Sequence, residues 1–159
     1  MELSITHIKP MSLAGKVIQT SLAENRTKAL WQSLMRDKAY FPPKEFQHLY
    51  SVEIYPNTYF KTFDPTQTFQ KWACVEWPDE HPLPHGFSAI TIPEGLYAVC
   101  HYKGHHLKAF QTFQYLFNEW LPASDYVVDQ RPHFEHMGKG YRGDSDDSEE
   151  FFYVPVAPK

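Results

Sequence analysis

Glu135 is the residue of this sequence whose type and position best suit chemistry. It lies in the segment RPHFEH, residues 131–136, among apolar and aromatic neighbours on a predicted strand. A carboxylate is costly to bury there without a partner. Because strand side chains alternate, Phe134 and Glu135 face opposite sides of the sheet. Glu135 is therefore either an ordinary surface residue or the floor of a pocket, where it would pair with a cationic ligand or act as a general acid or base.

Aromatic residues are abundant, with 12 Phe, 10 Tyr and 4 Trp. Rings supply apolar area and π faces that attract desolvated cations, so this content favours a pocket for an apolar or cationic ligand. Each ring also has a plain interpretation as core packing, because an aromatic stripe at helical spacing usually packs against a sheet. The candidates considered are Trp31, Trp72, Trp77, Tyr97 and Trp120.

Other motifs for metal or nucleotide chemistry do not support a site. His101 and His105 have i,i+4 spacing, but Gly104 interrupts a helix there, and HExxH is absent, so we predict surface histidines and no metal. The acidic run DSDDSEE, residues 144–150, lacks the spacing of a calcium loop. GxxxxGK[ST] and GxSxG are also absent, and we predict no cofactor. Cys74 and Cys100 lie in apolar runs and are expected to be buried free thiols.

The elements that must position these residues follow from hydrophobic periodicity and turn signals. One helix is expected from Asn25 or Glu24 to about residue 38, and a second spans residues 107–121, where Phe110, Phe113, Phe117 and Trp120 form a stripe that Pro122 ends. The expected strands are residues 4–9, 14–21, 49–55, 69–77, 87–92, 95–102, 125–129, 132–137 and 150–156.

The order of elements predicts an internal duplication. The turn Pro10–Leu13 corresponds to Pro93–Leu96, and strand, helix and paired strands follow in the same order in both halves. We therefore predict one α+β domain over residues 1–159, a tandem pseudo-symmetric repeat of two ββαββ units at about 1–78 and about 87–156. Its antiparallel sheet would carry two helices on one face, with a ligand cleft between the repeats.

Charge and hydropathy limit the partners. With 15 basic and 19 acidic residues, the chain has no electrostatic footprint for direct nucleic-acid binding. Residues 1–10 do not resemble a signal peptide, and no apolar stretch is long enough to span a membrane. We expect a cytoplasmic protein that has no contact with a membrane.

Several segments resemble the GyrI-like small-molecule-binding domains, which are related to the effector-binding half of AraC-type regulators. The specific matches in the second half are IPEGLYAVCHYKG, NEWLPAS, RPHFE and SEEFFYVPV, and the first half contributes KALWQSL and FQKWACVEW. The resemblance implies a pocket between the repeats, ringed by aromatic residues, with a central glutamate that corresponds to Glu135. The predicted ligand-binding residues are Glu135, Trp31, Trp72, Tyr97, Phe117, Trp120 and Tyr153.

Three functions remain open at this point. The first is a stand-alone module that senses or sequesters lipophilic or cationic compounds, a kind of multidrug binding. The second, suggested by the resemblance, is a hydrolase of strained cyclopropane-type electrophiles that uses Glu135 together with Tyr97 as catalytic residues. The third is an interaction with DNA gyrase, which rests on the resemblance alone. No residue pattern of the sequence indicates it, so any protein partner is unknown.

Overall fold

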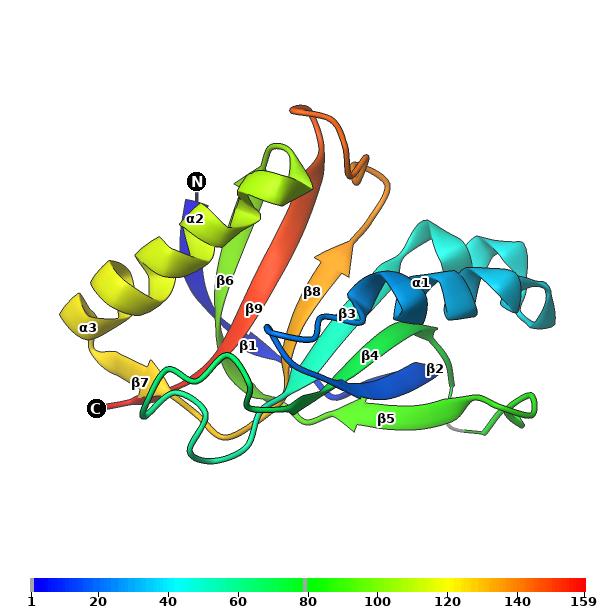
Figure 1. Ribbon diagram of the computed structural model, residues 1–159, viewed down its shortest axis with the longest axis horizontal. Helices are drawn as coiled ribbons and strands as arrows, with labels where there is room; N and C mark the ends of the chain where they lie inside the picture. The colour runs from blue at the N-terminus through cyan, green and yellow to red at the C-terminus, as the bar shows by residue number, and fades with distance from the viewer. Residues whose placement is uncertain (1, 79) are drawn as a thin grey trace.

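The computed structural model describes residues 2–78 and 80–159, and its centre is one antiparallel sheet (Figure 1). The strands follow the order β1-β6-β9-β8-β3-β4-β2-β5, and the short β7 adds to β9. Their bounds are β1 Glu2–Ile8, β2 Met11–Thr20, β3 Leu49–Ile54, β4 Phe69–Glu76, β5 Ser88–Ile92, β6 Gly95–Lys103, β7 Tyr126–Val128, β8 His133–Met137 and β9 Glu149–Pro158. The α+β prediction is confirmed.

The two halves of the chain meet at the middle of the sheet, where β3 pairs with β8. Each half gives its first strand to the other half, since β1 pairs with β6 and β5 pairs with β2. The pairing order is therefore the one that two exchanged ββαββ units would give. The duplication itself stays a prediction.

Two helical segments cover one face of the sheet, one over each half (Figure 1). The first, α1 (Thr27–Arg36), begins where Asn25 Oδ1 accepts a hydrogen bond from the Thr27 N–H, and it packs Leu30 and Leu34 against Ala73. It is followed by the short 3₁₀ turns η1 (Lys38–Tyr40) and η2 (Pro43–Gln47). None of the helices among residues 2–78 and 80–159 has the length and apolar character needed to cross a membrane.

The second helical segment is longer than predicted and changes its winding. A 3₁₀ turn, η3 (His106–Lys108), leads into α2 (Ala109–Tyr115), the π-helical turn η4 (Leu116–Trp120) and α3 (Leu121–Ala123). Pro122 does not end the helix, contrary to the prediction from its missing N–H. The π turn just before it shifts the hydrogen bonding, with the Leu121 N–H donating to the Leu116 carbonyl, and the chain stays helical to Ala123.

Both faces of the sheet are buried. Under the second helical segment lie Ala98, Cys100, Phe152, Val154 and Val156. The other face carries its own core cluster of Leu13, Tyr50, Val52, Trp72, Cys74, Ile92, Tyr97 and Phe134. As expected, Cys74 and Cys100 are buried free thiols. Because both faces are apolar, strand alternation alone cannot tell which face carries a ligand site.

Candidate functional site

A cavity of about 930 Å³ lies between the helices and the sheet. Its walls come from the start of α1, the loop between β3 and β4, the second helical segment, and strands β7, β8 and β9. Aromatic side chains dominate the lining: Tyr55, Tyr59, Phe60, Phe63, Phe69, Phe110, Phe113, Phe117, Tyr126 and Phe152. The volume falls within the ordinary range of small-molecule pockets, roughly 300–1,000 Å³.

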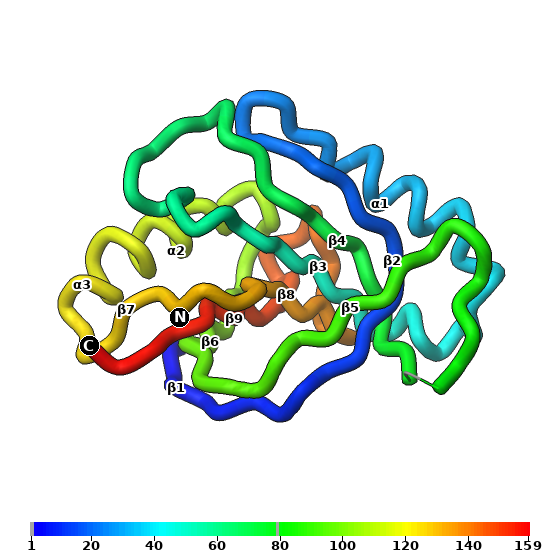
Figure 2. Tube along the Cα trace, turned by 90° about the horizontal axis from the view of Figure 1, so that it is seen from below, coloured from blue at the N-terminus to red at the C-terminus, as the bar shows by residue number. Residues whose placement is uncertain are grey.

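The loop at residues 55–68 closes one side of the cavity by reaching across to the other half of the molecule (Figure 2). The Phe60 ring stacks on Phe117, with centroids 5.2 Å apart, and on His133 at 5.4 Å. Tyr55 packs edge-on against His133 at 4.9 Å and beside Phe69. These contacts join the β3–β4 loop to the π turn and to β8 in one continuous wall of rings.

The floor of the cavity carries charged side chains on the central strands. The strand register places Glu53 of β3 opposite His133 of β8 and opposite Lys71 of β4. Glu135, two residues along β8, lies opposite Ser51 on the same face. Glu53, Lys71, His133 and Glu135 all line the cavity. Glu53 is only 6% exposed, whereas Glu135 is partly exposed. Glu135 is thus the carboxyl more accessible from the cavity.

Glu53 and Glu135 are in hydrogen-bonding contact and titrate as a pair. Burial raises the pKa of both groups, but other neighbours act unequally. The Lys71 ammonium and a 2.8 Å hydrogen bond donated by the Ser51 hydroxyl counteract the rise in the pKa of Glu53. The pKa of Glu135 is raised well above its usual value, by burial and then by the Glu53 charge, with Lys71 opposing. These neighbours therefore favour the proton on Glu135 and the charge on Glu53.

Other titratable groups surround this pair. Burial and then the Glu53 charge raise the pKa of Glu150, on β9, to about 7. Burial lowers the pKa of His133 to about 3, with a smaller effect of Arg131, so His133 is neutral. Tyr141, from the loop between β8 and β9, has its pKa raised to about 12 by burial first and then by nearby carboxyl groups, of which Glu150 has the largest effect. The floor thus holds two carboxyl groups, one ammonium and a neutral imidazole, and Glu150 and Tyr141 lie near it but outside the lining.

The structure brings the side chains of two predicted ligand-binding residues, Glu135 and Phe117, to the cavity. Tyr153 borders the cavity as well, but its ring stacks on Phe134 at 4.2 Å in the core of the opposite face. Among the described residues that line it, Trp31, Trp72, Tyr97 and Trp120 are not found. Trp72 follows Lys71 on β4 and therefore points to the other face of the sheet. Trp31 packs beside Leu30 and Leu34, and Trp120 packs against the cluster under the second helical segment.

Tyr97 has a structural role that explains its position away from the cavity. Its side chain is 0% exposed in the core of the opposite face, and its hydroxyl donates to the Pro132 carbonyl at 2.9 Å. The Arg131 guanidinium lies 4.8 Å from the centre of the Tyr97 ring and donates to the Leu96 and Val156 carbonyls. The residues before Glu135 thus anchor β8 to the sheet.

Sequence reasoning missed Glu53, Lys71 and the rings of the β3–β4 loop. Glu135 was identified because it is a charged residue in the middle of an apolar strand. The same pattern is present for Glu53 in LYSVEIY and for Lys71 in FQKWACV. The rings of the loop had no such signal, because their partners lie far away in the sequence.

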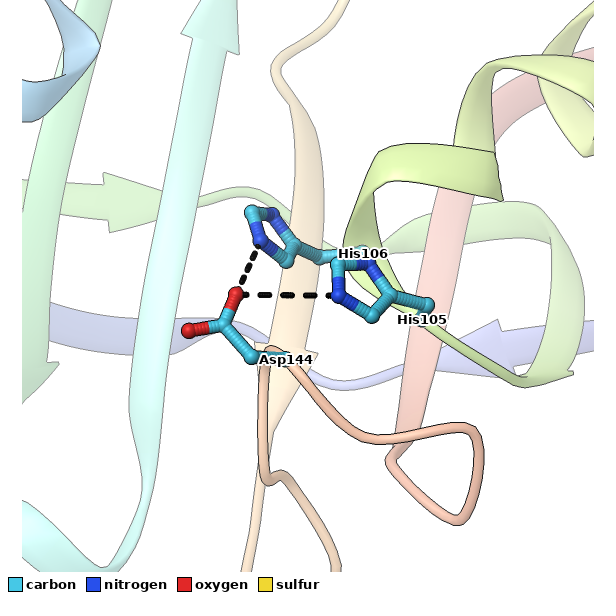
Figure 3. A group of neighbouring side chains, drawn as sticks. All are labelled: His105, His106 and Asp144. Atoms are coloured by element: carbon cyan, nitrogen blue, oxygen red, sulfur yellow. Dashed lines mark hydrogen bonds and ion pairs between the residues drawn. The ribbon is translucent and has the colours of Figure 1, made fainter.

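Two further motifs have structural explanations. His105, His106 and Asp144 meet at the surface, where Asp144 Oδ1 lies 2.7 Å from His106 Nε2 and 3.8 Å from His105 Nε2 (Figure 3). His105 Nδ1 accepts the Leu107 N–H, which leaves the ring proton on the Nε2 that faces the carboxylate. A metal ion bound at that nitrogen would displace the proton and cost the Leu107 bond. The cluster therefore serves to tie the β8–β9 loop to η3.

Residues Gly138–Gly143 read G-x-G-x-x-G, the spacing of a dinucleotide fingerprint. They connect β8 to β9, two antiparallel neighbours, and do not lead from a strand into a helix. The loop thus lacks the helix N-terminus that holds a pyrophosphate in that fingerprint.

An antiparallel sheet with helices on one face, enclosing a ring-lined cavity, is the arrangement of a small-molecule-binding domain. The model of the GyrI-like small-molecule-binding domain matches residues 1–156. This chain belongs to the GyrI-like family. No sequence among the curated proteins matches it.

Solved structures resemble the whole chain. The EcmrR C-terminal domain has a TM-score of 0.72 at 12% identity, covering 99% of this chain and 98% of that one. SAV2435 bound to tetraphenylphosphonium has a TM-score of 0.70 at 15% identity, with 99% and 94% covered. A hydrolase from Listeria innocua has a TM-score of 0.61 at 10% identity, with 98% and 92% covered. At these identities the likeness establishes the fold.

Proposed function

We propose that this domain binds lipophilic cations in the cavity, as a sensor or sequestering module. The observation that carries the proposal is the position of Glu135, a partly exposed carboxyl at the floor of a cavity walled by rings. Apolar rings would hold the body of the ligand, π faces would attract its charge, and the carboxylate would neutralise that charge away from water.

The mouth of the cavity fits a lipophilic guest as well. Five apolar side chains that line it are also exposed: Leu22, Phe60, Phe63, Phe110 and Val127. Phe63, on the β3–β4 loop, is 81% exposed. Exposed rings around a cavity typically mark a ligand or partner surface. Among the structures of this fold, SAV2435 has been solved with tetraphenylphosphonium, a bulky aromatic cation, and this makes tetraphenylphosphonium a suitable probe.

The test is calorimetric titration with tetraphenylphosphonium and with neutral triphenylphosphine oxide, which has a similar aromatic bulk. We expect the cation to bind and the neutral compound to bind at least tenfold more weakly. Glu135→Gln should lower the affinity for the cation by about thirtyfold, roughly 2 kcal/mol of binding free energy, as expected for loss of a desolvated charge partner.

Glu94→Gln is the matched control, because the Glu94 side chain is 65% exposed and lies outside the cavity lining. It should bind as the unchanged protein does. Equal affinity for the cation and the neutral compound, or equal affinity of Glu135→Gln and the unchanged protein, would show that the carboxyl does not serve as the counter-charge.

The Glu53–Glu135 pair also favours a second function, hydrolysis of strained electrophilic compounds of the cyclopropane type. A protonated carboxyl beside an ionised one is an acid and a base at one site. Glu135 would donate its proton to the atom that receives the electrons of the breaking carbon–carbon bond. Water would add its oxygen to the strained carbon and return a proton to Glu135. The test is mass spectrometry for a product one water heavier, formed by the unchanged protein and lost in Glu135→Gln.

A further inference from the structure

The floor of the cavity is poor in direct counter-ions. Glu53, Glu135 and Glu150 form none of the ion pairs found among residues 2–78 and 80–159. Lys71 lies beside Glu53 in the strand register and acts on the pair through its charge. Three carboxyl groups with one ammonium cannot all ionise in a buried site without strong repulsion.

We propose that a lipophilic cation enters this cavity in exchange for a proton and that Glu135 releases the proton. Before the ligand binds, Ser51 and Lys71 stabilise the negative charge on Glu53, and the charged Glu53 keeps the proton on Glu135. This inference rests on the proposed function and concerns how the same site works. It assigns a role to three residues that need not touch the ligand.

Geometry determines which carboxyl holds the proton. Glu53 accepts the Ser51 hydroxyl and faces Lys71 across the β3–β4 pair, so its ionised form has two stabilising partners. Glu135 lies opposite Ser51 and contacts Glu53, so its protonated form can donate to that carboxylate. With Lys71 positive, Glu53 negative and Glu135 neutral, this part of the floor carries no net charge.

The groups around Glu135 come from every neighbouring element. They are Glu53 of β3, Tyr55 of the β3–β4 loop, Lys71 of β4, Glu150 of β9, His133 of β8 itself, and Tyr141 of the β8–β9 loop. His133 and the tyrosines stay neutral between pH 5 and pH 9, since the pKa of His133 is lowered to about 3 and the tyrosine pKa values are raised, in each case mainly by burial. Glu150, whose pKa is raised to about 7, ionises in this range.

A ligand cation above Glu135 changes this balance. The cation disfavours the neutral acid relative to the carboxylate, because an opposite charge at short range in a desolvated site favours ionisation. The cavity regains neutrality when Glu135 loses its proton to solvent. Binding then strengthens with rising pH, and one released proton corresponds to about tenfold in affinity for each pH unit.

The first experiment measures proton release directly. Tetraphenylphosphonium is titrated calorimetrically at pH 6.5 in buffers of different ionisation enthalpy, and the slope of binding enthalpy against buffer enthalpy gives the protons released. We expect about one proton per bound cation for the unchanged protein and for Glu94→Gln. A slope of zero, with tight binding, would overturn the exchange while leaving the proposed function intact.

The second experiment needs no ligand. Infrared spectra of the unliganded protein at pH 7 should contain a carbonyl band of a protonated carboxyl that Glu135→Gln removes and Glu94→Gln retains. If no band is lost, Glu135 is ionised before binding and the inference is wrong. If the band is present but tetraphenylphosphonium does not bind at any pH, the proposed function fails, and the exchange fails with it.

Discussion

Glu53 and Glu135 touch across the pair of strands, β3 and β8, at which the two halves of the chain meet. Glu53 comes from the first half and Glu135 from the second, so the charged floor exists only once both halves have formed one sheet. Ser51 lies directly opposite Glu135, two residues before Glu53 on β3, and its hydroxyl donates a hydrogen bond to Glu53 at 2.8 Å. The variants below test what each of these neighbours does.

Ser51→Ala should destabilise the protein in a pH-dependent way. The buried Glu53 carboxylate loses a hydrogen bond from a group that is 1% exposed, and such bonds to charged groups are worth about 2 kcal/mol. The loss should be larger at pH 8 than at pH 5, because the raised pKa of Glu53 makes its carboxylate easier to protonate as the pH falls, and the hydrogen bond then no longer supports a charge. Urea unfolding at the two pH values measures this. A loss that does not change with pH would show that Ser51 supports packing only.

Lys71→Met should increase the number of protons that a cation displaces. The Lys71 ammonium lowers the pKa of both Glu53 and Glu135, so its removal lets the pair hold more proton before binding. Calorimetry with tetraphenylphosphonium at pH 6.5 should then give more protons per ligand than the unchanged protein. Lys108→Met, at an exposed position on η3, is the control. If proton release does not change, Lys71 does not govern the pair.

Glu150→Gln should stabilise the protein at high pH. The pKa of Glu150 is raised to about 7, by burial and then by the Glu53 charge, from 4.5 in the unfolded chain. The folded protein therefore holds this proton more tightly, and the corresponding stability is present below pH 4.5 and lost as the pH rises towards 7. Relative to the unchanged protein, the variant should gain up to about 3 kcal/mol between pH 4.5 and pH 8, at about 1.4 kcal/mol for each pKa unit.

Urea unfolding of Glu150→Gln at pH 4.5 and pH 8 provides the measurement, with Glu94→Gln as the exposed control. A difference from the unchanged protein that stays constant between the two pH values would mean that Glu150 ionises as freely in the folded state as in the unfolded one.

Much of the fold follows from the sequence, because alternation and turn residues define the strands and because a helical stripe such as Phe110, Phe113 and Phe117 defines a face. The same pattern also gave Glu135. Strand alternation did not predict which face of the sheet holds the cavity. Both faces are buried, so a strand such as KWACV sends Lys71 to one apolar layer and Trp72 to another without indicating which layer is hollow.

The wall of the cavity could not be predicted from the sequence for a different reason. Tyr55, Tyr59 and Phe60 follow β3 in a segment that the sequence describes only as a loop. The contact of Phe60 with Phe117 joins residues from opposite halves of the chain, and no local pattern specifies such a pairing. The winding of the second helical segment could not be predicted either. Pro122 predicts that the helix ends there, whereas the helix follows the π turn through Pro122 to Ala123.

Phe60→Ala should lower the affinity for tetraphenylphosphonium by about five- to tenfold and leave the fold intact. Phe60 stacks on Phe117 and His133 at the edge of the cavity, and each such ring pair contributes about 0.5–1.5 kcal/mol. Its side chain is 47% exposed, so its removal leaves no closed void in the core. Tyr40→Ala, which removes a 65% exposed ring outside the cavity lining, should bind the cation normally. Calorimetry compares the affinities, and thermal unfolding confirms that both variants fold. If Phe60→Ala binds like Tyr40→Ala, the loop at residues 55–68 does not hold the ligand, and the affinity comes from the helices and the floor.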